Sequence, residues 1–300
     1  MGELTGWPWG LCLTLAALSG LCVGSFINVV IVRLPAWERF LLLCESHGLD
    51  PAAAASELTQ RTPPPNLLRP ASHCPQCLHP IAVSDNVPLL SYLRLRGHCR
   101  HCQAKISLRY PLIELTAALM TIGVLWRYGV AWEVVRIWVL GFFLIALGVI
   151  DWREQQLPDR LTQPMLWLGL LNTLTLADGG YANISGLSHQ LANSVWGAII
   201  GYGSLWLLMR GFKLLTGREG MGLGDVKLLA AIGAWLGVSA LLPVLFLASL
   251  IGLSTALTLV VMRRASLGDA FPFGTFLAVA AFCLSIYRWQ DFLLLLRGVH

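Results

Sequence analysis

The chain has 300 residues, of which 56% are hydrophobic and only 12% are charged, and its formal net charge is +5. Soluble domains contain about a quarter charged residues, so the composition excludes an ordinary soluble protein and predicts a polytopic membrane protein. The positive charge does not indicate a nucleic-acid partner, because basic residues gather in the inner loops of membrane proteins, where they also favour anionic lipid heads.

Apolar stretches long enough to cross a bilayer, roughly 17 to 25 residues each, occur about eight times. We therefore predict an all-α polytopic membrane protein with about eight transmembrane helices. The expected domains are a first transmembrane helix (1–32), a cytoplasmic segment (33–110) and a multi-helix membrane domain (111–300). The expected spans are 8–32, 111–126, 132–150, 161–177, 190–209, 226–242, 244–262 and 271–288.

The positions of lysine and arginine predict the orientation. Glu3 and no basic residue precede the first span, which argues against a cleavable signal peptide. Of the 21 basic residues, all but Arg127, Arg136, Arg288 and Arg297 fall in segments that the spans assign to one side. Since basic residues favour the cytoplasm, we expect a periplasmic N-terminus and a cytoplasmic segment 33–110.

Two cysteine pairs predict a metal site within that cytoplasmic segment. Behind a linker at 52–65, the pairs have the form C-x2-C and their spacing is close to that of a zinc ribbon. Cytoplasmic thiols stay reduced, which favours zinc over disulfides, and four thiolates leave no open position for a water, so the zinc would be structural. A redox pair and a mixed set with His73, His79, His98 or His101 are the alternatives. The expected ligands are Cys74, Cys77, Cys99 and Cys102.

Two aspartates stand at the edges of apolar runs. Asp151 ends the run 138–150, and Asp225 precedes a run that starts at Leu228. A carboxylate at a membrane boundary is costly, so its expected role is functional, and two of them suggest an acid–base pair of the kind that aspartic peptidases use. Asp159 is a competing candidate that could simply cap a helix. Glu114 is a further intramembrane acid, which could pair with an arginine.

Four glycines precede the second aspartate: Gly217, Gly220, Gly222 and Gly224. Such a density permits close backbone approach, as an extended peptide substrate requires. The residues alone leave three alternatives open: an aspartic protease, a proton-coupled transporter that uses the same acids, and a membrane scaffold with a zinc module. A transporter is expected to carry discontinuous helices in matched halves, and the sequence shows none.

Several motifs, in order along nearly the whole chain, are similar to those of one family. The chain resembles the bacterial type IV prepilin peptidases, the leader peptidases of type II secretion. The motifs are Gly24-Ser-Phe-Ile-Asn28 to Pro35, the block Cys74 to Glu114, Asp151 to Asp159, Glu219 to Lys227, and Phe271-Pro-Phe-Gly274. The separation of Asp151 and Asp225 is slightly longer than the family pattern, in the expected outer loop 178–190.

This resemblance implies an inner-membrane aspartic endopeptidase with its active site facing the cytoplasm. It would cleave the leaders of type IV prepilins or type II secretion pseudopilins and N-methylate the new N-terminus, with S-adenosylmethionine as methyl donor. The implied catalytic pair is Asp151 and Asp225. The implied accessory residues are Asp159, Gly222, Gly224 and Lys227.

Helix dipoles suggest how the pair shares its proton. A helix C-terminus disfavours a carboxylate and an N-terminus favours one, by roughly 0.3–1 kcal/mol and ~2 when partly buried. Asp151 follows a span and Asp225 precedes one. The sequence therefore predicts an ionised Asp225 and a protonated Asp151.

Overall fold

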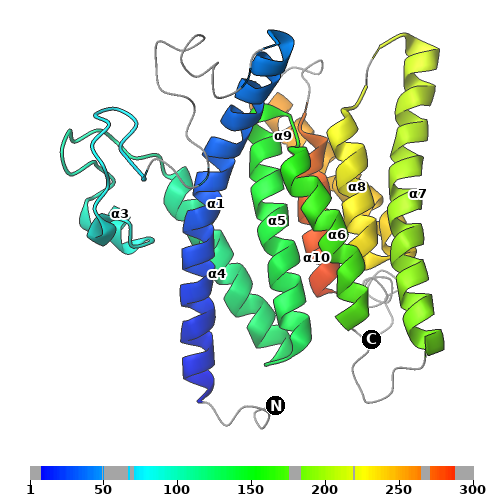
Figure 1. Ribbon diagram of the computed structural model, residues 1–300, viewed down its shortest axis with the longest axis horizontal. Helices are drawn as coiled ribbons and strands as arrows, with labels where there is room; N and C mark the ends of the chain where they lie inside the picture. The colour runs from blue at the N-terminus through cyan, green and yellow to red at the C-terminus, as the bar shows by residue number, and fades with distance from the viewer. Residues whose placement is uncertain are drawn as a thin grey trace. The chain divides into compact units, whose positions relative to one another are not determined.

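The computed structural model describes residues 8–48, 50, 67, 71–175, 184–218, 220–264 and 271–287 (Figure 1). The expected linker 52–65, Glu219 and residues 178–183 of the expected outer loop lie outside these residues, and the rest of that loop, 184–190, is helical rather than a loop. Within the described part the chain is helical, with two isolated bridges and no strand, which confirms the all-α prediction. The elements are α1 (Trp9–Ser46), η1 (Val83–Asp85), α3 (Leu90–Arg94), α4 (Arg109–Tyr128), α5 (Trp132–Glu154), α6 (Asp159–Thr175), α7 (Ile184–Thr216), α8 (Leu223–Leu236), α9 (Val238–Val261) and α10 (Phe273–Ile286).

Each of the eight expected spans overlaps a helix, but the expected span 226–242 crosses the break at Gly237 from α8 into α9, and not all of these helices meet the demands of a bilayer. Among the described residues, 4 helices are long and apolar enough to cross a membrane: α1, α5, α7 and α9. The helix α10 is apolar but shorter, and α8 has only 14 residues, about 21 Å of helix. The membrane character of the protein is thus confirmed, and the number of eight crossings stays a prediction.

The chain forms two compact units, Met1–Trp138 and Val139–His300. The first unit contains α1, the cysteine segment and α4, and the second contains α6 to α10 with most of α5. The expected domain boundaries at residues 32 and 110 remain predictions. The structure adds that α1 does not end near residue 32 but continues through Pro35 to Ser46, which places Cys44 in a helix, buried against Phe40 and Trp37.

In the first unit, α1 and α4 pack against each other at two glycines. A Cβ at Gly20 would meet Thr121 and the backbone of Ala118, and a Cβ at Gly24 would lie 2.8 Å from the Cα of Glu114. Small residues one turn apart let two helix backbones approach closely in a membrane. The Thr121 hydroxyl also donates to the carbonyl of Ala16 at 2.7 Å, so the crossing combines close packing with an interhelical hydrogen bond.

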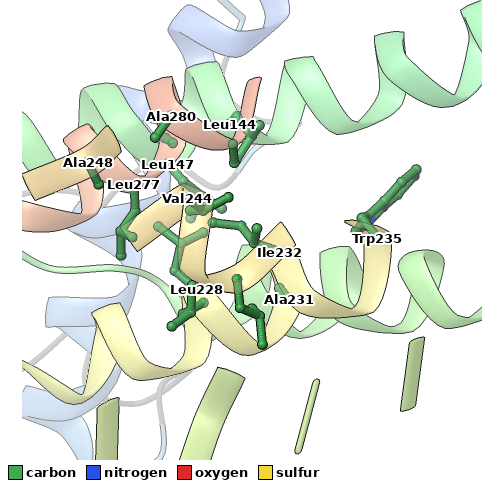
Figure 2. Close-up of a cluster of buried hydrophobic side chains, with 14 of the residues drawn as sticks. Leu144, Leu147, Leu228, Ala231, Ile232, Trp235, Val244, Ala248, Leu277 and Ala280 are labelled. Carbon is green, nitrogen blue, oxygen red and sulfur yellow. The ribbon is translucent and has the colours of Figure 1, made fainter. Parts of the chain in front are cut away.

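The second unit is built around α8. Almost every residue of this helix from Asp225 to Trp235 is buried, and α6, α7, α9 and α10 pack against it. Its leucine and isoleucine side chains meet those of α5, α9 and α10 in one apolar cluster (Figure 2). A helix that is apolar on all sides is expected to lie inside such a bundle. Asp225 opens this helix and is therefore fixed by the packing of the whole unit.

A second glycine contact fixes α8 against α7. Gly197 of α7 and Gly233 of α8 meet backbone to backbone, so a Cβ at either would collide with the carbonyl of the other. One turn along, a Cβ at Gly201 would lie 2.7 Å from the carbonyl oxygen of Leu229. This contact leaves α8 little freedom to slide.

Candidate functional site

The structure brings Asp151 and Asp225 together inside the second unit. Asp151 lies in the last turn of α5, and Asp225 lies in the first turn of α8. Both are buried, with 4% and 9% of their surface exposed. A buried carboxylate is unfavourable unless hydrogen bonds or other charges compensate for the loss of water.

Gly274, in the first turn of α10, lies between the two carboxyl groups. A Cβ at this position would lie 2.9 Å from Oδ1 of Asp225 and 3.0 Å from Oδ2 of Asp151. One oxygen of each aspartate therefore approaches the same point. The absence of a side chain at Gly274 is what makes room for the pair.

The start of α10 supplies the hydrogen bonds that Asp151 needs. The backbone N–H of Thr275 donates to Oδ2 of Asp151 at 2.7 Å. The Thr275 hydroxyl lies 3.1 Å from the same oxygen and 2.9 Å from the carbonyl oxygen of Gly148. The first N–H groups of a helix have no partner within it, so the N-terminus of α10 is a natural place for one negative charge.

These hydrogen bonds argue against the proton distribution that the helix dipoles predict. Each hydrogen bond to a charged group contributes about 1.5–3 kcal/mol, more than the roughly 0.3–1 kcal/mol of a helix end. Asp151 has two donors on Thr275, whereas Asp225 has one, the backbone N–H of Gly274. The ionised form is therefore favoured at Asp151, although α5 ends there.

Leu157, in the loop between α5 and α6, packs beside the aspartates. A Cβ at Gly224 would lie 2.9 Å from Cβ of Leu157, and a Cβ at Gly274 would lie 2.9 Å from its Cδ1. Gly224 therefore allows the close contact with Leu157, whereas the sequence argument linked these glycines to the approach of a peptide substrate. A Cβ at Gly222 would meet only the backbone nitrogen of Gly224, at 3.9 Å, so packing gives no reason for glycine there.

Asp159 and Lys227 form an ion pair. Nζ of Lys227 lies 2.6 Å from Oδ1 and 2.7 Å from Oδ2 of Asp159. Asp159 begins α6 and Lys227 lies two residues after Asp225. The pair joins the loop that carries Leu157 to the helix that carries Asp225, and so the structure places Asp159 beside the pair of buried aspartates rather than in it.

The four expected metal ligands come together in the first unit. The sulfur atoms of Cys74, Cys77, Cys99 and Cys102 all lie within 4.8 Å of one another, and they are the one such group of possible ligands among the described residues. Sγ of Cys74 and Sγ of Cys102 are 3.7 Å apart. Tetrahedral zinc with Zn–S bonds of about 2.3 Å requires sulfur separations of about 3.8 Å, so the donors and their spacing fit zinc.

The two cysteine pairs adopt the same local fold. In the first, the Leu78 N–H donates to the Cys74 carbonyl, and in the second the Gln103 N–H donates to the Cys99 carbonyl. Leu78 and Gln103 have nearly equal positive φ angles of 57° and 58°. The backbone N–H groups of Cys77 and then Gln76 donate to the Cys74 sulfur and lower the pKa of this thiol to about 6, which favours the thiolate that a metal needs.

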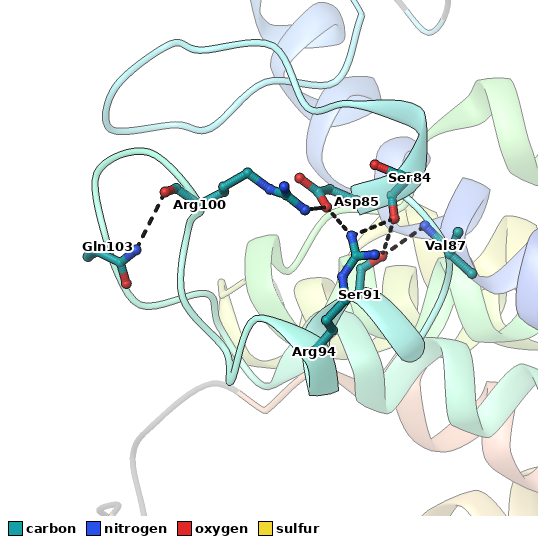
Figure 3. A network of polar contacts seen from close by, with 7 residues as sticks. All are labelled: Ser84, Asp85, Val87, Ser91, Arg94, Arg100 and Gln103. Atoms are coloured by element: carbon teal, nitrogen blue, oxygen red, sulfur yellow. Dashed lines mark hydrogen bonds and ion pairs between the residues drawn. The ribbon is translucent and has the colours of Figure 1, made fainter.

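An ion-pair network supports the second cysteine pair (Figure 3). Asp85 in η1 accepts hydrogen bonds from Arg94 in α3 and, at 2.5 Å, from Nη2 of Arg100, which lies between Cys99 and Cys102. The hydrogen bond from Arg100, followed by that from Arg94, lowers the pKa of Asp85. The network therefore holds the second pair against η1 and α3.

Glu114 is buried in α4, and its partners are not arginines. Its Oε2 accepts the backbone N–H of Leu89 at 2.9 Å, and the hydroxyl of Ser25 also bonds to the carboxyl group. Leu89 has a φ of 56°, which is uncommon for a leucine and costs energy. Glu114 thus connects α1, α4 and the cysteine segment within the first unit.

Sequence reasoning missed Thr275. The motif that ends at Gly274 stops one residue before it, and a threonine in an apolar segment usually bonds to its own helix. The available signal was its position: a hydroxyl in the first turn of an apolar helix, directly after a glycine. What the site can do follows from the two carboxyl groups, which can share one proton and act as acid and base on one substrate.

Comparisons with known proteins agree with this division of the chain. The family described as "Bacterial Peptidase A24 N-terminal domain" matches residues 18–128, and the "Type IV leader peptidase family" matches residues 138–257. No solved structure matches the chain.

Three relatives carry the name "Prepilin leader peptidase/N-methyltransferase". The protein of Aeromonas hydrophila is 44% identical over 297 residues, which is 95% of each chain. That of Neisseria gonorrhoeae is 46% identical and covers 90% of this chain and 88% of its own. That of Pseudomonas aeruginosa is 42% identical and covers 91% and 89%.

Proposed function

The chain belongs to the type IV leader peptidase family, and on this premise we propose that Asp151 and Asp225 are its catalytic pair. The protein is a prepilin leader peptidase with N-methyltransferase activity, as its relatives over nearly the whole chain are named. A proton-coupled transporter finds no support among them. The observation that carries the catalytic assignment is the approach of both carboxyl groups to Gly274.

In the proposed reaction the ionised carboxylate takes a proton from a water as the water oxygen attacks the scissile carbonyl carbon. The protonated carboxyl group donates its proton to the carbonyl oxygen, which gives a tetrahedral diol. The diol collapses as the carboxyl group that took the water proton gives it to the leaving nitrogen, the other carboxylate takes a proton from a diol hydroxyl, and the C–N bond breaks, which returns the pair to its starting state. Asp151, with its two donors on Thr275, is the ionised partner at the start, and Asp225 holds the proton. Because the groups interact, the titration belongs to the pair.

Asp159 and Lys227 have a supporting role in this proposal. Their ion pair holds the Leu157 loop against the first turn of α8. A substrate that reaches the aspartates as an extended peptide would pass this loop. Gly224, where Leu157 packs, keeps the loop close, and Gly222 leaves open space beside it.

We further propose that Cys74, Cys77, Cys99 and Cys102 bind one structural zinc. The support is the sulfur geometry and the repeated backbone fold. Four thiolates would complete the coordination of the ion, so it would stabilise the segment and take no part in cleavage. S-adenosylmethionine remains the proposed methyl donor. The described residues contain no strand followed by a glycine-rich loop, the arrangement that usually binds dinucleotides, so no residues are assigned to it and no step is derived through it.

The proposed substrates are type IV prepilins or type II secretion pseudopilins. The lipid bilayer would hold these substrates so that they reach the proposed catalytic pair at the cytoplasmic face of the inner membrane. The basic residues support a periplasmic N-terminus.

The assignment of the catalytic pair is tested by cleavage of a prepilin by the full-length protein purified in detergent. Asp151→Asn and Asp225→Asn should each abolish cleavage and leave the melting temperature and the zinc content unchanged. Glu133→Gln, a change of another acid on α5, should leave cleavage intact. If either aspartate variant cleaves at the normal rate, the proposed pair is wrong.

A further inference from the structure

Thr275 is the residue of α10 that contacts the proposed catalytic pair through both its backbone and its side chain. The N–H bond to Asp151 is short, at 2.7 Å, and does not depend on the identity of the side chain. The hydroxyl contact, at 3.1 Å, does depend on it. The two can therefore be separated by mutation.

The hydroxyl group of Thr275 has two acceptors within reach and one proton to give. The acceptors are Oδ2 of Asp151 and the carbonyl oxygen of Gly148, at 3.1 and 2.9 Å, and a hydroxyl donates one hydrogen bond at a time. A bond to an ionised acceptor is about twice as strong as one to a neutral acceptor. The proton should therefore turn to Asp151 when that carboxyl is ionised and to Gly148 when it is protonated.

In either state the partly buried hydroxyl keeps an acceptor. No free energy is lost to an unsatisfied group when Asp151 gains a proton, because the Gly148 carbonyl takes over. When Asp151 loses the proton again, the hydroxyl returns to it. The arrangement favours the ionised form of Asp151 and still allows Asp151 to take up a proton.

From this geometry we propose that Thr275 is a positioning residue for the peptidase, which orients Asp151 and sets the pH at which it becomes ionised. The inference rests on the proposed catalytic pair of Asp151 and Asp225. Thr275 acts through Asp151 and needs no contact with the substrate.

Other charged groups around Asp151 cannot replace this effect. On α8, Lys227 is paired with Asp159 of α6, and on α5 Arg153 lies 3.9 Å from Glu154. Asp225, whose carboxyl group approaches the same point beside Gly274, opposes ionisation of Asp151 because both would be negative. Besides these groups, the elements of the unit carry Glu133 and Arg136 near the start of α5, Arg160 at the start of α6, His189, Tyr202, Arg210 and Lys213 on α7, and Cys283 near the end of α10.

The test compares kcat/KM for cleavage of a prepilin as a function of pH in Thr275→Val, Thr275→Ser and the wild-type protein. Valine keeps the shape and the N–H but removes the hydroxyl, so kcat/KM at neutral pH should fall about tenfold to hundredfold. The acid limb of the profile should move upward by about one pH unit, since ionised Asp151 has lost a donor. Serine keeps the hydroxyl and should restore both the rate and the limb.

A matched control is Thr258→Val on α9. The exposed hydroxyl of Thr258, like that of Thr275, lies within hydrogen-bond distance of a backbone carbonyl, but this carbonyl belongs to its own helix. This variant should keep the wild-type profile. Melting temperature and zinc content report whether each variant folds, and single-turnover cleavage with enzyme in excess gives a profile even for a slow variant.

An unshifted acid limb in Thr275→Val, or a serine variant as impaired as the valine variant, would overturn the proposal. A shift confined to the basic limb would also overturn it, because Asp151 would then be the protonated partner. Cleavage by Asp151→Asn or Asp225→Asn in the same assay would instead mean that the catalytic pair itself is wrong, whatever the Thr275 variants do.

Discussion

Lys227 reaches both carboxylate oxygens of Asp159, at 2.6 and 2.7 Å, across 68 positions of the sequence. Each of the two follows one of the proposed catalytic aspartates in the chain: Asp159 begins α6 after Asp151, and Lys227 lies in the first turns of α8, two residues after Asp225. Among the described residues, neither Asp159 nor Lys227 forms a side-chain hydrogen bond with Asp151 or Asp225. The expected role of the ion pair is therefore to fix the position of the Leu157 loop.

Neutralising this ion pair should weaken cleavage more than stability. Lys227→Gln or Asp159→Asn should lower the free energy of unfolding by only about 0–1 kcal/mol, because both side chains are partly exposed. Cleavage should fall severalfold as the loop loosens, and the exchanged variant Asp159→Lys with Lys227→Asp should recover part of it. No recovery in the exchanged variant, measured by cleavage of a prepilin, would show that the charge pair is not what matters.

Placing a methyl group at Gly274 should disable the peptidase without unfolding it. In Gly274→Ala the new Cβ would meet one oxygen of each aspartate at 2.9 and 3.0 Å, so the carboxyl groups must move apart, and we expect cleavage to fall more than tenfold. Alanine is itself favoured over glycine in a helix by about 1 kcal/mol. The control is Gly203→Ala on α7, whose Cβ would meet nothing within 4 Å. Equal rates in the two variants would contradict the geometry.

Metal analysis of the purified protein should find about one zinc per chain, as for a single tetrahedral site. The double variant Cys74→Ser with Cys99→Ser should lose the metal and become sensitive to protease between residues 71 and 107. Cys22→Ser with Cys283→Ser, which changes two exposed thiols outside the cluster, should keep it. Because the proposed catalytic pair lies in the other unit, methylation should suffer more than cleavage. Zinc retained after the loss of Cys74 and Cys99 would exclude this ligand set.

The stability that Asp85 gives to the cysteine segment should depend on pH. The hydrogen bonds from Arg100 and Arg94 lower the pKa of Asp85. The stabilisation that ionised Asp85 gives is therefore fully present above the usual carboxyl pKa of about 4. It is lost as the pH falls through the lower pKa that Asp85 has in the folded protein. Asp85→Asn should therefore release zinc to a chelator faster than the wild type at pH 7, and the difference should shrink in acid. A difference that grows in acid would have the wrong sign.

Fusions to a reporter of compartment test the orientation. Reporters after residue 60 and residue 215 should report the cytoplasm, and one at residue 184 the periplasm, as the basic residues predict. A periplasmic signal at residue 60 would overturn the orientation. It would also remove the argument that the four thiols stay reduced.

The sequence was informative about elements and poor about contacts. Apolar runs located every long helix because burial in lipid or in a bundle demands such runs, and the C-x2-C pairs identified the sulfur cluster because metal ligands recur at fixed local spacing. The end of α1 was missed because a charged residue such as Arg33 does not end a helix. The ion pair of Asp159 with Lys227 and the contact of Thr275 with Asp151 depend on how α5, α8 and α10 pack, and no local pattern encodes that.

The donors that hold the buried Asp151 are an amide and a hydroxyl, both uncharged and both partly buried at the start of α10. Ions in solution weaken attraction between exposed charges over about 8–10 Å at ordinary ionic strength, but they act much less on buried groups. The chemical step should therefore be nearly indifferent to added salt. Contacts between the substrate and exposed charges of the protein, by contrast, should weaken as salt rises, so ionic strength would affect KM and leave kcat almost unchanged.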